Sequence, residues 1–295
     1  SIPPTHPTEF LVDAPVHAMM VAIIQVTALF VLIPRATTLQ YGQNLNRSEA
    51  DPHKPIYRHR LINFQDMQYS ADIQLGGQTI RGILDTGSFE MLVFSKECKT
   101  CGSAKAYSPR VSRFFKMGIR RRVHSYGSGS CSARDARDKI DIGPLSAPSQ
   151  AFWEATDCEM PLLDTAEFNA VVGIGPPGQP LATAKSGLQQ VKEVELVSKK
   201  NKGGGVPQQV KKLKREYEED VEDAPKKPSL LESLSIDFFS MCLERGIGAP
   251  GWLIWNDLDP RKRQLFTGIK VVGEVTWGVK LTGISFDGGA QSTSV

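Results

Sequence analysis

Mainly β structure is the prediction for this chain of 295 residues, and it rests on two patterns. Polar and apolar residues alternate over residues 68–83 across the pair Gly76-Gly77, which indicates two strands joined by a tight turn. Short apolar runs between glycine-containing turns then recur downstream, with few long helical periods. These runs lie near Phe94 and at residues 123–126, 140–142, 170–174 and 252–255.

The composition is that of a globular protein. Hydrophobic residues make up 40% of the chain and charged residues 23%, which excludes disorder throughout. The formal net charge is only +3, and the basic residues are not gathered on a face with aromatic groups for base stacking. We therefore expect no nucleic-acid partner.

Residues 1–38 are expected to be a leader. Residues 16–33 are almost all apolar, just long enough for a membrane span. If Met19 or Met20 is the true start, residues 21–33 form the apolar core of a secretory signal peptide, although no basic residue precedes it. A retained membrane anchor and a buried core helix are the alternatives. Export would place the protein in the secretory pathway, outside the cell or in a lysosome-like or vacuole-like compartment.

Residues 181–229 differ in character from the rest. They are rich in Lys and Glu, contain three consecutive glycines at 203–205, and carry a basic block at 211–215 followed by an acidic block at 216–223. Such a segment is typical of a solvated insert, and we expect an exposed loop. A partner-binding arm is the alternative, for example in a membrane-anchored scaffold.

Asp85 is the candidate for chemistry. It follows an apolar strand in the segment ILDTGS, residues 83–88, where Gly87 allows the backbone to approach closely. A general acid or base could lie there, but Asp-Thr-Gly alone is a weak motif because both Asp and Gly are ordinary turn residues.

The surrounding segments resemble the pepsin-like aspartic proteases. Residues 68–76 resemble the first hairpin of that family, residues 85–88 its first active-site loop, and residues 126–130 (YGSGS) its flap. Residues 168–175 resemble the strand that threads beside the catalytic loop, and residues 235–240 and 277–286 resemble the end of the first lobe and the start of the second. The order agrees with the family from Leu61 to about Gly289.

The resemblance implies an aspartic endopeptidase. Two carboxylates would share a proton and activate a water that attacks the peptide bond without a covalent intermediate. Asp85 would be one of them, and Ser88 its hydrogen-bonding neighbour. The resemblance implies an active-site loop of Thr86, Gly87 and Ser88, and a substrate-binding flap of Tyr126, Gly127, Ser128 and Gly129.

A second catalytic Asp is not found in the sequence. Asp164 is followed by Thr and Ala and lacks the required glycine, and residues 287–289 (DGG) read as a hairpin turn. We expect a chain truncated before its second loop. A catalytically dead peptide-binding pseudoprotease is the alternative, and a homodimer pairing two Asp85 loops is a remoter one.

The resemblance also implies the domain boundaries. Residues 39–60 would be a short prosegment, in which the basic cluster 58–60 (RHR) could pair with active-site carboxylates and release them in acid. Residues 61–258 would form the amino-terminal lobe, and residues 259–295 the start of an incomplete carboxy-terminal lobe.

One departure from the family pattern and the five cysteines remain to be considered. Where the family continues Ser-Ser-Asn-Leu-Trp, this chain has SFEML at residues 88–92, so Tyr126 loses an indole partner and could be held more loosely. The resemblance implies a small disulfide loop between Cys98 and Cys101, which a secreted chain would oxidise. Cys131 and Cys158 could form a second bridge or remain two separate thiols, since connectivity is not deducible from sequence. Cys242 is expected to be a buried small hydrophobe or bonded to a missing residue.

The expected partner is a peptide or protein substrate. No cofactor is implied, and no metal, because a zinc site would need two ligands besides the pair Cys98 and Cys101. We expect a monomer, with membrane association only if residues 16–33 are retained.

Overall fold

The computed structural model describes most of the region from Lys54 to Asn256 and a few shorter segments. The described residues are 29–32, 54–176, 178–200, 206–244, 246, 248–256, 269–273, 275–280, 284–286 and 289–293. Most of the expected leader and the first part of the expected prosegment therefore lie outside them. Within the described residues, no helix has the length and apolar character needed to cross a membrane.

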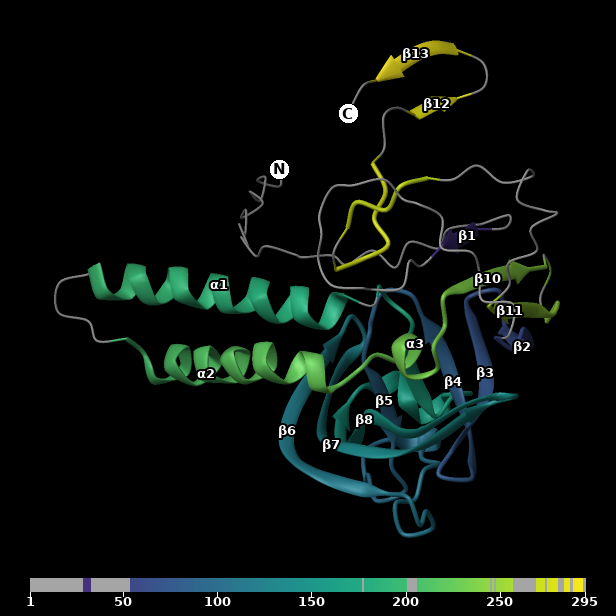
Figure 1. Cartoon of the computed structure of the whole chain (residues 1–295), viewed down its shortest axis with the longest axis horizontal. Helices are drawn as coiled ribbons and strands as arrows, with labels where there is room; N and C mark the ends of the chain where they lie inside the picture. Colours follow the sequence, from purple (N-terminus) through teal and green to yellow (C-terminus); the bar gives the residue numbers. More distant parts are fainter. Residues whose placement is uncertain are drawn as a thin grey trace, which may run out of the picture.

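One large sheet dominates the molecule (Figure 1). Its strand order is β1-β10-β11-β2-β3-β4-β9-β5-β8-β7-β6. The strands are β1 (Leu29–Leu32), β2 (Tyr57–Phe64), β3 (Gln68–Leu75), β4 (Gln78–Asp85), β5 (Met91–Phe94), β6 (Lys116–Tyr126), β7 (Gly129–Ile142), β8 (Leu145–Glu159), β9 (Ala170–Gly173), β10 (Phe238–Leu243) and β11 (Gly251–Trp255). The expectation of a mainly β fold is confirmed.

Part of this sheet closes on itself. Strand β3 pairs with β4 on one side and also with β7, through Gln74 opposite Asp141 and Leu75 opposite Ile140. The path β3-β4-β9-β5-β8-β7 therefore returns to its start and encloses apolar side chains, among them Ile73, which is almost completely buried. Burial of these side chains is the main stabilising contribution to the lobe.

The first predicted hairpin is confirmed. Strands β3 and β4 pair in antiparallel fashion from Ser70 opposite Ile83 to Leu75 opposite Gln78. Gly76 and Gly77 connect them with φ angles of +58° and +77°. Two consecutive positive φ angles characterise the two-residue turns that match strand twist, which explains the glycine pair.

Strands β1, β10, β11 and β2 extend the sheet beyond the closed part. Four residues of the apolar leader segment, Leu29–Leu32, form β1 and pair with β10. The basic cluster 58–60 lies within β2, where the imidazole Nε2 of His59 is 2.9 Å from the carbonyl oxygen of Asp72 and Arg58 lies over the ring of Trp252. The described contacts of His59 and Arg58 are thus with other strands of the sheet. The expected boundary of the prosegment at residue 60 remains a prediction.

Cys242 corrects one expectation. It lies on β10 as a free and exposed thiol, not as a buried small hydrophobe. The first three residues of the strand, Phe238, Phe239 and Ser240, are buried, whereas Cys242 lies in the less buried second half of the strand and faces solvent.

The insert is helical, so the expectation of an exposed loop is wrong. Helices α1 (Gln179–Lys200) and α2 (Gln208–Asp223) lie side by side and project from the sheet (Figure 1). The oppositely charged residues stand at helical spacing, as in the pair between Lys199 and Glu195 at 2.6 Å, and Glu195 also reaches Lys214 of α2 at 3.0 Å. Gly187 leaves room for the ring of Tyr217, since an added Cβ would lie 2.2 Å from it.

Short elements connect the rest. The helix α3 (Leu230–Ser233) begins with a reciprocal capping box between Ser229 and Glu232.

A separate hairpin pairs β12 (Ile284–Phe286) with β13 (Gly289–Thr293), and Phe286 stands opposite Gly289, in agreement with the predicted hairpin turn. Three 3₁₀ turns are η1 (Gly102–Ala104), η2 (Pro161–Thr165) and η3 (Ala224–Lys226).

Candidate active site

Asp85 is the last residue of β4 and is held by the backbone around it. Its Oδ1 accepts a hydrogen bond from the amide of Gly87 at 2.9 Å, and its carbonyl oxygen accepts one from the amide of Ile174 at 2.8 Å. The carboxylate is half-buried, whereas Thr86 and Gly87 are exposed. An aspartate held this way by local backbone donors is oriented before any ligand binds.

The strand β9 threads against the Asp85 loop. It runs parallel to β4, with Asp85 opposite Gly173. The amide of Gly173 donates to the carbonyl oxygen of Glu90 at 3.0 Å, and the amide of Gly175 donates to that of Ser88 at 2.8 Å. An added Cβ on Gly173 would lie 2.6 Å from the carbonyl oxygen of Glu90, so only glycine permits this passage.

Ser88 does not make the expected hydrogen bond. Its hydroxyl oxygen is buried and has no hydrogen-bond partner among the described residues. The carboxylate of Asp85 is instead served by the amide of Gly87. A buried, unpaired hydroxyl beside a candidate carboxylate remains available to a ligand or to a group outside the described residues.

A cavity of about 160 Å³ connects Asp85 with the expected flap. Tyr126 and Ser128 line it together with Asp85, so two segments that are far apart in the chain lie at one place. The remaining lining is mostly apolar and consists of Gln68, Ile83, Met160, Leu162, Phe168 and Val171.

The flap tip is a tight turn between β6 and β7. Tyr126 pairs with Gly129, which leaves Gly127 and Ser128 as the turn. Gly129 has a φ of +142°, and an added Cβ would lie 2.1 Å from the carbonyl oxygen of Glu159. The glycine is therefore required both by its backbone conformation and by its close approach to β8.

Tyr126 lies in an environment that favours its neutral form. Burial raises the pKa of its phenol, and the negative charges of Glu90 and Asp85 raise it further. The phenol therefore keeps its proton, and can donate a hydrogen bond, throughout the pH range in which proteins are stable.

Glu90 is a residue near the candidate site that the sequence analysis did not single out. It accepts a hydrogen bond from the indole N–H of Trp153 on β8 at 2.9 Å, and it contacts His124 Nδ1 at 3.2 Å and Arg122 Nη1 at 3.3 Å, both on β6. Burial alone would raise the pKa of this carboxyl, but the contacts with His124, Arg122 and Trp153 together hold it below its usual value. The only signal in the sequence was the Glu at a position where the family has Asn.

Asp164, the rejected candidate for a second carboxylate, lies elsewhere. It is in η2, packed against the turn at Gly102, and does not line the cavity. The position agrees with its interpretation as an ordinary turn residue.

The four predicted cysteines form two neighbouring disulfides. Cys98 is bonded to Cys101, and Cys131, near the tip of the flap hairpin, is bonded to Cys158 on β8. The Sγ atoms of Cys101 and Cys158 are only 3.4 Å apart, so both bridges belong to one buried cluster. In this oxidised form the sulfurs are not thiolate ligands for a metal.

Comparison with known proteins agrees with this geometry. Residues 68–201 match the family model described as eukaryotic aspartyl protease. In this region the chain is similar to the pepsin-like aspartic proteases. The match covers β3 to β9, and thus the Asp85 loop, the β6–β7 hairpin that was expected to be the flap, and the threading strand.

Curated proteins that are similar to this chain come from several eukaryotic groups. A vacuolar aspartic protease of Candida albicans is 33% identical over 39% of this chain and 28% of its own length. Aspartic proteinase A2 of Arabidopsis thaliana is 33% identical over 48% of the chain and 28% of its own length. Cathepsin D of Dictyostelium discoideum is 30% identical over 39% of the chain and 31% of its own length. The chain thus spans about a third of the length of the relatives it matches.

Proposed function

We propose that this chain supplies one half of the active site of an aspartic endopeptidase. The single observation that carries the proposal is the cavity in which Asp85 meets Tyr126 and Ser128 of the flap. Asp85 would be one of two carboxylates that activate a water for attack on a peptide carbonyl, and the second would come from a loop outside the described residues.

The cavity suits one side chain of an extended peptide. Its walls include Ile83, Phe168 and Val171, so an apolar side chain would bury surface there. The backbone of the same peptide would run under the flap, where Ser128 and Gly129 offer polar groups for strand-like pairing. Closure of the flap would exclude water other than the reacting one.

An acidic, oxidising compartment fits this function. Two relatives bear the names vacuolar aspartic protease and cathepsin D, and the chain itself carries two disulfides. We therefore place its work in a vacuole-like or lysosome-like compartment reached through the secretory pathway.

Cleavage by the chain together with the segment that supplies the second carboxylate tests the proposal, because the mechanism needs both carboxylates. A mixed peptide library is incubated with this full-length protein between pH 3 and pH 7, and new termini are identified by mass spectrometry. We expect cleavage beside apolar residues, and its loss in Asp85→Asn. The matched control is Asp164→Asn, an identical change in the turn η2 outside the cavity, which should leave cleavage unaltered.

Peptide binding without cleavage is the second candidate. It is favoured by the fact that Asp85 is the one acidic residue in the described lining of the cavity. The same full-length protein is titrated with a peptide that carries a non-cleavable hydroxyethylene group. Binding without any new termini would support this second function, and the absence of both binding and cleavage would refute both proposals.

A further inference from the structure

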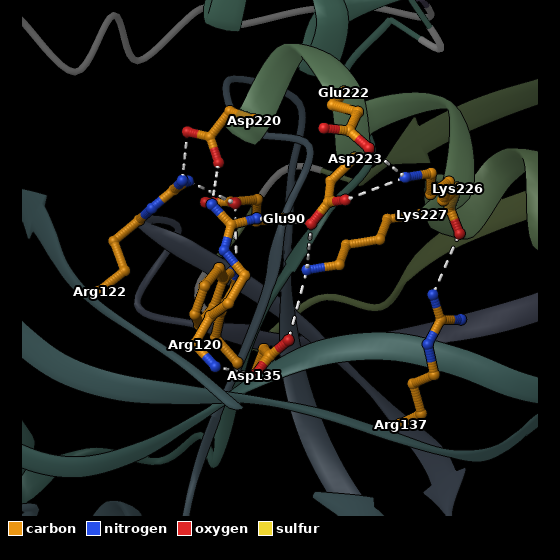
Figure 2. Close-up of polar contacts among 11 residues, drawn as sticks. Glu90, Arg120, Arg122, Asp135, Arg137, Asp220, Glu222, Asp223, Lys226 and Lys227 are labelled. Atoms are coloured by element: carbon orange, nitrogen blue, oxygen red, sulfur yellow. Dashed lines mark hydrogen bonds and ion pairs between the residues drawn. The ribbon is translucent and has the colours of Figure 1, made fainter. Parts of the chain in front are cut away.

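The acidic end of the helical insert lies against the outer strand of the flap hairpin. Figure 2 shows Asp220 and Asp223 of α2 pointing toward Arg120 and Arg122 of β6. Asp220 pairs with both arginines, and Asp223 Oδ2 lies 3.1 Å from Arg120 Nη1. These residues are about 100 positions apart in the chain.

These ion pairs are partly shielded from solvent. The side chains of Asp220 and Arg120 are 15% and 18% exposed, in contrast to the pair between Lys226 and Glu222, whose side chains are 61% and 76% exposed. Exposed pairs contribute little because water and salt screen them, whereas paired arginine forks in partly buried positions contribute more.

The contact falls where the flap strands are least well paired. The register of β6 against β7 breaks between Met117 and Arg121. At this irregularity the amide of Arg120 donates to Asp135 Oδ1 of β7 at 2.8 Å. Lys227, near the end of the insert, lies 3.3 Å from Asp135 Oδ2 and 3.8 Å from Asp223 Oδ2. Asp135 thus replaces a missing ladder bond, and Lys227 links its carboxylate to the insert.

The same network reaches the Asp85 loop. Arg122 contacts Asp220 of the insert with one terminal nitrogen and Glu90 Oε1 with the other, the latter at 3.3 Å. Glu90 is five residues after Asp85 and accepts the amide of the threading residue Gly173 on its carbonyl oxygen. A continuous set of charged contacts therefore joins α2, the flap strand and the loop of the candidate catalytic residue (Figure 2).

We propose that the α1–α2 insert is a clamp that holds the flap strand β6 at a set position relative to the Asp85 loop. Asp220 and Asp223 are its positioning residues, and they act through Arg120 and Arg122. The benefit for peptide binding rests on the function proposed above, but the clamp itself is a property of the fold.

Hydrogen exchange of the flap tests the clamp from the insert side. In the variant Asp220→Asn with Asp223→Asn, both carboxylates become neutral amides of nearly equal shape. We expect amides of residues 116–126 to exchange about tenfold faster, because local opening no longer breaks charge-assisted bonds. The matched control is Glu216→Gln with Glu222→Gln, two changes of the same kind on the same helix whose partners, Lys212 and Lys226, lie within the insert region.

A second pair of variants tests the clamp from the flap side. Arg120→Gln removes both ion pairs of that residue, and Arg121→Gln changes the neighbouring arginine, for which the described residues show no ion pair. We expect amides of residues 116–126 to exchange faster in Arg120→Gln, and their exchange rate to be unchanged in Arg121→Gln. If the variant with both Asp220→Asn and Asp223→Asn does not fold, the comparison of Arg120→Gln with Arg121→Gln still tests the clamp.

Peptide affinity separates the clamp from the proposed function. Each variant is titrated with the hydroxyethylene peptide, and we expect binding about three- to tenfold weaker in the clamp variants only, since a less ordered flap must be fixed on binding. Unchanged flap exchange in both clamp variants would overturn the clamp, whatever the peptide result. Absence of peptide binding by the unaltered chain would overturn the proposed function, while the exchange data still decide the clamp.

Discussion

Trp153 donates its indole N–H to Glu90 Oε1 at a distance of 2.9 Å. The indole lies on β8, beside the flap, and its polar group is satisfied by the carboxylate that follows the Asp85 loop. The family pattern has a tryptophan at the position of Leu92, which is buried here. An indole thus stands near the flap of this chain but serves Glu90, and the phenol of Tyr126 is left for other partners.

Replacing that indole should destabilise the lobe. Trp153→Phe leaves a partly buried carboxylate without one of its donors, so we expect a loss of about 1–3 kcal/mol in the free energy of unfolding. Denaturant titration measures it. A double-mutant cycle with Glu90→Gln should show coupling between the two changes, and strictly additive losses would contradict the importance of this bond.

The contribution of Glu90 to stability should depend on pH. Its folded-state pKa is below the ordinary value of 4.5, so its stabilising effect is present above that value and is lost as the pH falls through the folded-state pKa. The stability difference between the unaltered chain and Glu90→Gln should therefore shrink as the pH falls from 6 toward 3. Urea titrations at the two pH values measure it, and a constant difference would be contrary to the expectation.

Gly173 should not tolerate a side chain. In Gly173→Ala the new methyl group meets backbone atoms of Phe89 and Glu90, each at 2.6 Å, so the Asp85 loop must move and we expect a cost of about 2–3 kcal/mol. The control is Gly178→Ala, where no described atom lies within 4 Å of the added carbon. Thermal unfolding of both variants separates steric crowding from the general effect of replacing glycine.

The two disulfides should differ in their contributions. Cys131 and Cys158 are 27 residues apart, whereas Cys98 and Cys101 are 3 apart. A disulfide that closes a longer loop restricts the unfolded chain more. Replacing both Cys131 and Cys158 by serine should therefore lower the free energy of unfolding by about 3–4 kcal/mol, and replacing both Cys98 and Cys101 by about 1–2 kcal/mol. Denaturant titration compares them, with the exposed free thiol in Cys242→Ser as a control that should change little. Equal losses for both pairs would argue against this entropic account.

Local patterns in the sequence determined the strands, the first hairpin and the Asp85 loop. Alternation along β3 and β4 decides which residues face the core, and the pair Gly76-Gly77 specifies the turn. The family resemblance pointed to Asp85, Tyr126 and Ser128 as site residues, and in the structure the three line one cavity. Their catalytic and substrate-binding roles stay predictions.

Only the tertiary structure decided how the charged groups are paired. The acidic block of the insert looked like solvated sequence, because sequence shows sign and spacing of charges but not which of them meet across 100 residues. Folding brings Asp220 to Arg122, and Arg122 to Glu90, while Trp153 completes the set from another strand. The physical reason is that a partly buried charge is stable only beside its partner, and the closed sheet determines which partner lies within reach.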